Sequence, residues 1–198
     1  MKYMSEQLAD GLGWAEGPAI LSDGRVCFVE TYRSQVSVWE KGKGVSQYAF
    51  TAGGPNSCVL GKSGELYVCQ NGGTTGPWRA KQMVQPSIQV IASQGAKAET
   101  LVTQIEGISF NGPNDLVFGN NGNLYFTDPG TYNTTNPDPS YIFELAPNGD
   151  GRLLAELKPS TFPNGIAVEA DGSLVWAESY SGMVRRLNIS SLVIEDIC

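Results

Sequence analysis

Asn111–Pro129, with the sequence NGPNDLVFGNNGNLYFTDP, is the stretch from which the fold can be inferred. Its apolar side chains predict two short strands, Leu116–Phe118 and Leu124–Thr127. The Gly and Asn residues between these strands are typical of a tight turn, so the stretch predicts a β-hairpin. Asn114 lies just before the first strand, and Asp128-Pro129 closes the second.

The same pattern occurs four times along the chain. Each copy begins with a polar residue, has a turn glycine eight positions later, and has another polar residue six positions beyond that glycine. The leading residues are Glu16, Asn56, Asn114 and Asn164, the glycines are Gly24, Gly64, Gly122 and Gly172, and the closing residues are Glu30, Gln70, Asp128 and Glu178. The leading residues are 40, 58 and 50 positions apart, a period that is typical of radially repeated architectures.

Two further strands are predicted after each hairpin. We expect them at Gln35–Glu40, Val45–Phe50, Ser87–Ala92, Glu99–Val102, Tyr141–Leu145, Leu153–Leu157, Met183–Asn188 and Leu192–Ile197. Four antiparallel strands per unit predict an all-β fold, a β-propeller, with blade units at about 14–52, 53–105, 108–160 and 162–198. A β-sandwich also has many short strands, but it would not keep one register in all four units.

The number of units bears on how the ring closes. The last expected strand ends next to Cys198, so residues 1–198 are interpreted as a single propeller domain that holds four blade units. A closed ring of four blades is one interpretation. We favour the other, an incomplete propeller that is the first part of a longer protein.

Composition excludes some classes of partner. The chain has 198 residues, a formal charge of −7, and 13 Lys and Arg residues that are scattered along the sequence. Nucleic-acid binding requires clustered basic residues, so we expect no nucleic-acid partner. The first residues, MKYMSEQLADGLGW, lack the apolar segment of a signal peptide, and no apolar run is long enough to span a membrane. We therefore expect a cytoplasmic monomer without a membrane partner.

Cysteine and histidine usage narrows the chemistry further. Cys27, Cys58 and Cys69 lie in predicted strands without metal-binding spacing, so we expect buried free thiols, with a disulfide or metal site as the alternative. The sequence contains no histidine. This absence excludes Ser-His-Asp and Cys-His catalysis and a histidine-ligated zinc.

The leading residues of the four units predict a cation site. The first strand of each propeller blade lines the central channel, so these residues should converge at one mouth of the channel. One carboxylate and several amide oxygens are hard donors of the kind that Ca²⁺ prefers. A Ca²⁺-like divalent cation is therefore predicted, with Zn²⁺, Mn²⁺ or Mg²⁺ as alternatives. The competing interpretation is that Asn residues before strands simply form turns.

Four motifs resemble those of the senescence marker protein/gluconolactonase (regucalcin-like) family. They are WAEGP at 14–18, GPND at 112–115, FTDP at 126–129 and FPNG at 162–165. The resemblance covers essentially the whole chain. It implies a six-bladed propeller with one catalytic divalent metal in the tunnel, and hydrolysis of a sugar lactone or another small lactone.

The resemblance also implies roles for individual residues. The family's metal ligands match Glu16, Asn114 and Asn164. The family's fourth ligand, an Asp that is also the favoured base or nucleophile, belongs to a fifth blade and has no counterpart before Cys198. The catalytic residue therefore stays unassigned, and the chain as given is expected to be catalytically incomplete.

Other residues are expected near the substrate. Asn56 is predicted to face the same mouth as a hydrogen-bonding partner of substrate or water. Asp128 is placed with it, either at the substrate or as a residue that structures the loop. Tyr132, in the loop 129–140, and Trp78, in the insertion 71–85, could contact substrate or anchor their loops.

Two other functions fit the same residues. A phosphotriester or fluorophosphate hydrolase would use the same metal site, because it too needs an electrophile with its oxygen on the cation. A non-catalytic, calcium-binding propeller scaffold is the second alternative.

Overall fold

A computed structural model describes residues 5–198 of the chain. Over this range the chain folds into β-strands, with one short 3-10 helix, η1 (Thr31–Arg33). The predicted all-β class is confirmed. Within the described residues, no helix is long and apolar enough to cross a membrane.

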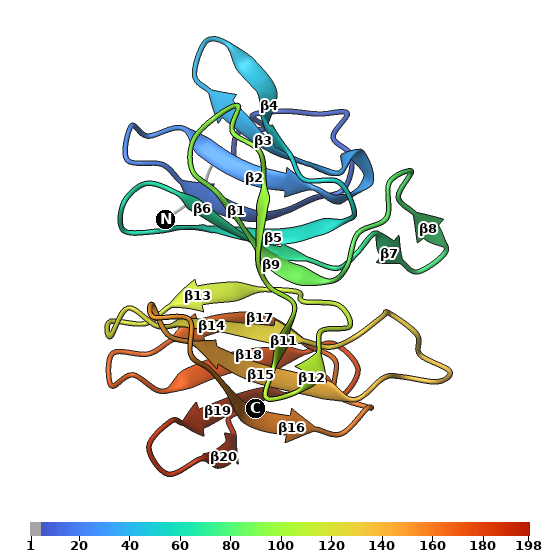
Figure 1. Cartoon of the computed structure of the whole chain (residues 1–198), viewed down its shortest axis with the longest axis vertical. Helices are drawn as coiled ribbons and strands as arrows, with labels where there is room; N and C mark the ends of the chain where they lie inside the picture. The colour runs from blue at the N-terminus through green and yellow to red at the C-terminus, as the bar shows by residue number, and fades with distance from the viewer. Residues whose placement is uncertain (1–4) are drawn as a thin grey trace.

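Four sheets of four antiparallel strands form the blades (Figure 1). Blade 1 consists of β1 (Ala15–Ile20), β2 (Val26–Glu30), β3 (Gln35–Glu40) and β4 (Gly44–Phe50). Blade 2 consists of β5 (Pro55–Leu60), β6 (Leu66–Gln70), β9 (Ser87–Ile91) and β10 (Glu99–Val102). Blade 3 consists of β13 (Leu116–Phe118), β14 (Leu124–Asp128), β15 (Ser140–Leu145) and β16 (Gly151–Leu157). Blade 4 consists of β17 (Pro163–Val168), β18 (Leu174–Glu178), β19 (Val184–Asn188) and β20 (Val193–Asp196).

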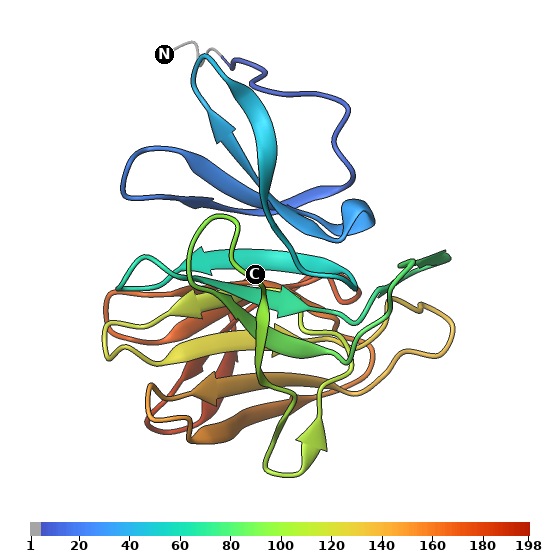
Figure 2. The same ribbon diagram turned by 45° about the horizontal axis from the view of Figure 1, so that its top comes forward.

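Two small hairpins stand outside the blades. β7 (Thr74–Thr75) pairs with β8 (Trp78–Arg79) in the long insertion of blade 2, and β11 (Gln104–Ile105) pairs with β12 (Ile108–Ser109) between blades 2 and 3. The predicted blade strands are all present, with ends that differ by at most two residues from the expected ones. The β7–β8 hairpin and the loop after β14 project from the same side of the molecule (Figure 2).

The blades are arranged radially as a β-propeller. β5 packs against β1 and β2, and β13 packs against both β5 and β17. Blades 1 and 2 form the upper half of the molecule in Figure 1, and blades 3 and 4 form the lower half. The first strands of all four blades line one cavity of about 570 Å³, which we call the channel cavity.

The hydrophobic core is divided into three layers, one between each pair of neighbouring blades. Alternate side chains of a strand face opposite layers, as the pleat of a strand requires. Cys58 of blade 2 faces blade 1, whereas Cys69 of the same blade packs with Phe126 of blade 3. Trp176 fills the third layer, between blades 3 and 4. Cys27, Cys58 and Cys69 are buried free thiols, as predicted.

The four turn glycines of the repeat adopt a backbone conformation that favours glycine. Their φ angles are 86°, 96°, 82° and 88° for Gly24, Gly64, Gly122 and Gly172. Other residues pay a steric penalty in this left-handed region, so the repeated glycine makes each tight turn possible without strain. The predicted turn role of these four glycines is confirmed.

The core layers should respond differently from the outer strands to loss of an aromatic ring. Phe126 is fully buried, with its ring centroid 5.2 Å from Phe110 and 5.3 Å from Phe143. We expect Phe126→Ala to lower the free energy of unfolding by about 3–5 kcal/mol, measured by urea denaturation. Phe50→Ala, at a position that is 50% exposed, is the matched control and should cost far less. Equal losses for the two variants would contradict this core assignment.

Candidate active site at the channel mouth

The structure brings the leading residues of the four blade units together. Glu16, Asn56, Asn114 and Asn164 all line the channel cavity. They also line a second cavity of about 450 Å³, whose lining includes residues of the β7–β8 hairpin and of the loop after β14. We call this second space the mouth cavity. Four residues that are up to 148 positions apart, from Glu16 to Asn164, thus surround one space.

At the start of three of the inner strands the pairing is irregular, so the leading side chains there do not follow the regular alternation of the strand. The register between the first two strands shifts after Glu16 in blade 1, after Pro55 in blade 2 and after Pro163 in blade 4. A bulge of this kind turns a side chain away from the direction that regular alternation would give it. In blade 3 the strand starts later, and the backbone N–H of Asn114 donates to the carbonyl oxygen of Thr127 at 2.9 Å.

Hydrogen bonds orient two of the three amides. Asn56 Nδ2 donates to the backbone carbonyl of Asn114 at 3.2 Å, and Asn164 Nδ2 donates to Ser179 Oγ at 3.2 Å. Because each amide nitrogen is used in this way, the Oδ1 atom of each residue remains as the acceptor end of the amide. The arrangement supplies oxygen donors to a shared space.

Glu16 provides a carboxylate at the mouth. Desolvation by neighbouring atoms raises the pKa of this carboxyl, although the side chain is exposed. A hydrogen bond from the Trp14 side chain lowers the pKa of Glu16, and the negative charge of Asp115 raises it. The net effect is a raised pKa, which means that the site resists the negative charge of Glu16 unless a cation balances it.

Asp115 ties three blades together, a role that sequence reasoning missed. Its carboxylate accepts a hydrogen bond from Ser57 Oγ of blade 2 at 2.6 Å and from the backbone N–H of Ile166 of blade 4 at 2.9 Å. Thr127 Oγ1 adds a link between blades 3 and 4 by donating to the carbonyl of Asn164 at 2.9 Å. The available signal was the repeat itself, because the positions equivalent to Asp115 hold small residues: Gly17, Ser57 and Gly165.

Asp128 lies behind the site and lines neither cavity. It is 1% exposed, and its carboxylate accepts backbone N–H groups from Asn111 at 2.9 Å, Gly112 at 2.7 Å and Gly130 at 3.1 Å. Because the carboxylate is buried and borders neither cavity, substrate in these cavities does not reach it. This geometry corrects the expectation of a direct substrate contact and supports the loop-structuring alternative.

The closing polar residues of blades 1 and 2 act in the same way as Asp128. Glu30 Oε2 accepts the backbone N–H of Gly13 at 2.6 Å, and Gln70 Oε1 accepts that of Gly54 at 2.6 Å. Each glycine lies two or three residues before the leading residue of its blade. In blade 4, Glu178 instead accepts Trp176 Nε1 at 3.1 Å and pairs with Arg185 at 3.1 Å.

The two aromatic candidates differ in their position. Tyr132 is 53% exposed and lines the mouth cavity. Trp78 is half-buried and stacks on Tyr32, with ring centroids 5.0 Å apart, and it is Tyr32 that lines the cavity. Trp78 therefore supports a wall of the mouth from behind.

The donor set at the mouth is one carboxylate and three amides. Across residues 5–198, there is no group of three or more His, Cys, Asp or Glu side chains that could hold a metal ion. A site of nitrogen and sulfur ligands suited to zinc is thus not formed by this part of the chain. Amide oxygens with a single carboxylate are oxygen ligands of the kind that suit Ca²⁺.

Comparison with known proteins gives one family and one fold. A family model described as the SMP-30/Gluconolactonase/LRE-like region matches residues 14–192. A gluconolactonase from Zymomonas mobilis is 29% identical over 194 residues, which cover 88% of this chain and 51% of the relative. The chain thus spans about half the length of this curated relative.

Two solved structures share the propeller fold. A structure described as a candidate gluconolactonase superposes with a TM-score of 0.74 at 24% identity, covering 92% of this chain and 62% of the other. A gluconolactonase from Xanthomonas campestris superposes with a TM-score of 0.71 at 22% identity, covering 90% of this chain and 59% of the other. At these identities the likeness shows the fold alone.

Asp128 provides a test of how the mouth is held in place. Asp128→Asn replaces one acceptor oxygen by an N–H₂ group that faces backbone N–H donors, so we expect a loss of about 1–3 kcal/mol in the free energy of unfolding. Asp10→Asn, which alters an exposed side chain, is the control. Urea denaturation of both variants measures the difference. A loss no larger than that of the control would show that Asp128 does not support the loop.

Proposed function

Because this chain belongs to the SMP-30/gluconolactonase/LRE-like family, we propose that the protein is a metal-dependent hydrolase that opens a small lactone at the mouth cavity. One observation carries the proposal. Glu16, Asn56, Asn114 and Asn164 line the same cavity, and the amide nitrogens of Asn56 and Asn164 are held by other groups. The chemistry proposed for the site follows from these four side chains.

Three of these residues fit a divalent cation. Glu16 offers the negative charge, and its raised pKa reflects a site in which that charge lacks compensation. The amide oxygens of Asn114 and Asn164 would add neutral donors, and Ca²⁺ commonly takes six to eight such oxygens, including water. Ca²⁺ is therefore our first choice, ahead of Mg²⁺, Mn²⁺ and Zn²⁺.

A cation bound there would polarise the lactone carbonyl and stabilise the charge that develops on its oxygen. Glu16 would hold the cation by its charge. Asn114 and Asn164 would supply donors without further charge, which keeps the site electrophilic. Asn56 would accept a hydrogen bond from the attacking water or from a substrate hydroxyl, since its nitrogen already donates to Asn114.

The proton acceptor for the attacking water is not assigned to residues 5–198. Asp115 also lines the channel cavity, and its two carboxylate oxygens accept hydrogen bonds from Ser57 and from the backbone of Ile166, which assigns it to linking blades 2, 3 and 4. Glu16 would be committed to the cation. By resemblance to the family, we propose that an Asp of a further blade takes this role.

Calcium binding tests the cation site directly. In isothermal titration calorimetry of the purified chain, Glu16→Gln should weaken Ca²⁺ binding by on the order of tenfold or more, because it removes the charged ligand. Glu99→Gln removes an exposed carboxylate on β10, away from both cavities, and should bind Ca²⁺ like the wild type. Unchanged affinity in Glu16→Gln would mean that the cation site is wrong.

The raised pKa of Glu16 predicts a pH dependence in the metal-free protein. Folding raises the pKa of Glu16, so the folded state holds the protonated carboxyl more readily than the unfolded state does. The stabilisation that results is complete below the ordinary pKa of about 4.3 and is lost as the pH rises through the folded pKa. Glu16→Gln should therefore be more stable than the wild type at pH 7. The difference should shrink towards pH 4.

Urea denaturation at both pH values, on protein stripped of metal, measures this difference. Glu99→Gln again serves as the control for removing one negative charge. A Glu16→Gln variant that is less stable than the wild type at pH 7 would contradict the raised pKa.

Turnover tests the reaction class. We expect the full-length protein to hydrolyse glucono-δ-lactone in the presence of Ca²⁺ and to lose this activity in a chelator, as followed by acid release. Parallel assays with a dialkyl fluorophosphate address the phosphotriesterase alternative. Faster turnover of the fluorophosphate would favour that alternative. Ca²⁺ binding without turnover of either substrate would favour a non-catalytic calcium-binding propeller.

A further inference from the structure

Two aromatic pairs occupy equivalent places in blades 1 and 4. In each pair, the first ring belongs to the residue two positions before the leading residue of the blade. The second ring belongs to the residue two positions after the closing polar residue. The pairs are Trp14 with Tyr32 in blade 1 and Phe162 with Tyr180 in blade 4. In blades 2 and 3 the same places hold glycines: Gly54 with Gly72, and Gly112 with Gly130. The outer two of the four blades thus carry rings where the inner two carry none.

The two pairs have matching geometry. Their ring centroids are 5.4 Å apart in Trp14–Tyr32 and 4.7 Å apart in Phe162–Tyr180. The backbone is also equivalent, because the N–H of Thr31 donates to the carbonyl of Trp14 at 3.1 Å and that of Ser179 donates to Phe162 at 2.9 Å. The aromatic pairs are therefore a property of the repeat, placed identically in two blades.

A third ring packs against each pair. Trp78 of the β7–β8 hairpin stacks on Tyr32 at 5.0 Å. Tyr132, in the loop after β14, lies 5.4 Å from Phe162 and 5.5 Å from Tyr180. We call the first group the blade 1 wall (Trp14, Tyr32, Trp78) and the second the blade 4 wall (Phe162, Tyr180, Tyr132). Trp14, Tyr32, Tyr132 and Phe162 line the mouth cavity.

The walls keep large apolar surfaces open to the cavity. Trp14 is 52% exposed, Tyr32 41% and Tyr132 53%. Exposed aromatic side chains that gather on one cavity mark a binding surface more strongly than scattered ones do. Trp14 and Phe162 also hold φ angles of 63° and 53°, a conformation that bulky residues rarely adopt and that is found preferentially at ligand sites.

Two glycines of blade 3, Gly112 and Gly130, also line the mouth cavity. A Cβ atom at Gly112 would lie 2.5 Å from the carbonyl oxygen of Gly130, and one at Gly130 would lie 2.6 Å from Cβ of Asp138. These contacts require glycine at both positions, so neither position adds a side chain to the mouth cavity.

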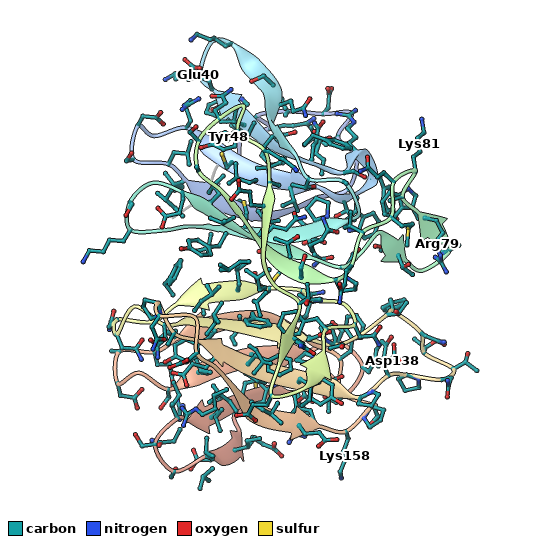
Figure 3. All side chains as sticks on the ribbon, viewed as in Figure 1. Glu40, Tyr48, Arg79, Lys81, Asp138 and Lys158 are labelled. Atoms are coloured by element: carbon teal, nitrogen blue, oxygen red, sulfur yellow. The ribbon has the colours of Figure 1, made fainter. Side chains whose placement is uncertain are left out.

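Charge restricts the ligand further. Glu16 is the single charged residue among the described residues that line the mouth cavity, and no Lys or Arg lines it within residues 5–198. Arg79 bonds to the backbone carbonyls of Gly76 and Trp78 and lies at the outer end of the hairpin (Figure 3). An anionic group placed among the aromatic rings, away from Glu16, would thus have no cationic side chain to pair with.

We propose that the mouth cavity selects neutral lactones that carry a flat, apolar substituent, with the substituent held between the blade 1 wall and the blade 4 wall. The lactone part of this inference rests on the proposed function. Aromatic walls bind such a substituent by burying its surface and by ring stacking. A phosphate or carboxylate carried on the substituent itself is disfavoured, since it would lose its water between the aromatic walls, where no Lys or Arg side chain within residues 5–198 lines the cavity to pair with it.

Binding of matched ligands tests the proposal. The probes are γ-butyrolactone, γ-phenyl-γ-butyrolactone and its 4-carboxyphenyl analogue, each titrated into the Ca²⁺-loaded chain and followed by calorimetry and tryptophan fluorescence. We expect the phenyl lactone to bind at least about tenfold more tightly than the unsubstituted one. The carboxyphenyl analogue should lose most of this gain. Equal affinity for all three would overturn the proposal.

Two variants locate the effect in the walls. Tyr132→Ala removes an exposed ring. Trp14→Gly gives blade 1 the glycine that blades 2 and 3 have at the equivalent position, and glycine adopts the positive φ of this position without strain. Each should weaken binding of the phenyl lactone by about three- to tenfold. Phe50→Ala, which removes an exposed ring on β4 outside the mouth, should leave phenyl-lactone binding unchanged. Wild-type affinity in both wall variants would overturn the proposal.

The outcomes separate this proposal from the function on which it rests. Binding of the phenyl lactone that depends on Tyr132, without hydrolysis of any lactone by the full-length protein, would support the walls and contradict the lactonase. Hydrolysis of glucono-δ-lactone without a preference for the phenyl lactone would support the lactonase and overturn the walls. If the protein neither prefers the phenyl lactone nor hydrolyses glucono-δ-lactone, both the wall proposal and the lactonase proposal are overturned. Ca²⁺ titrations of each wall variant show whether the cation site has been disturbed.

Discussion

Buried hydrogen bonds to irregular backbone hold the channel mouth in place. The chain enters each inner strand through a loop whose N–H groups have no partner in the sheet, and unpaired buried N–H groups are costly. In the first three blades a buried side chain at the end of the second strand accepts them: Glu30, Gln70 and Asp128. Because these residues accept the N–H groups of the loops from behind, the leading residues in front are not needed as acceptors for them.

The closing residues support the backbone and the leading residues face the cavity, which explains how one repeated unit can carry different side chains at the cavity in each blade. The residues behind the mouth are constrained by the backbone groups that they satisfy. Those in front vary from Glu16 to Asn56, and from the ring of Trp14 to the glycines of blades 2 and 3, without altering the strands. Asp115 then links blades 2, 3 and 4, so the position of each blade relative to the next also depends on hydrogen bonds at the channel.

Most of the fold could be predicted because its determinants are local. Alternating side chains predict strands such as Leu116–Phe118, and glycines such as Gly122 predict the turns between them. The free, buried state of Cys58 also followed from its place in a strand. Asp128 shows the limit of such reasoning. It is as polar as Asn114 and close to it in sequence, yet one is buried under three backbone N–H groups and the other lines both cavities.

The sequence by itself determined the all-β class, the four repeated units and the register that places Glu16, Asn56, Asn114 and Asn164 in equivalent positions, because periodicity and turn chemistry act over a few neighbouring residues. The tertiary structure alone decided which polar side chains face the cavity, how the amides of Asn56 and Asn164 are turned, and that rings from opposite ends of the chain form two walls. The repeat places these residues in equivalent positions, but their contacts also depend on partners in other blades, as for Asn56 and Asn114, or on loops such as the one that carries Tyr132, and no local pattern encodes those partners.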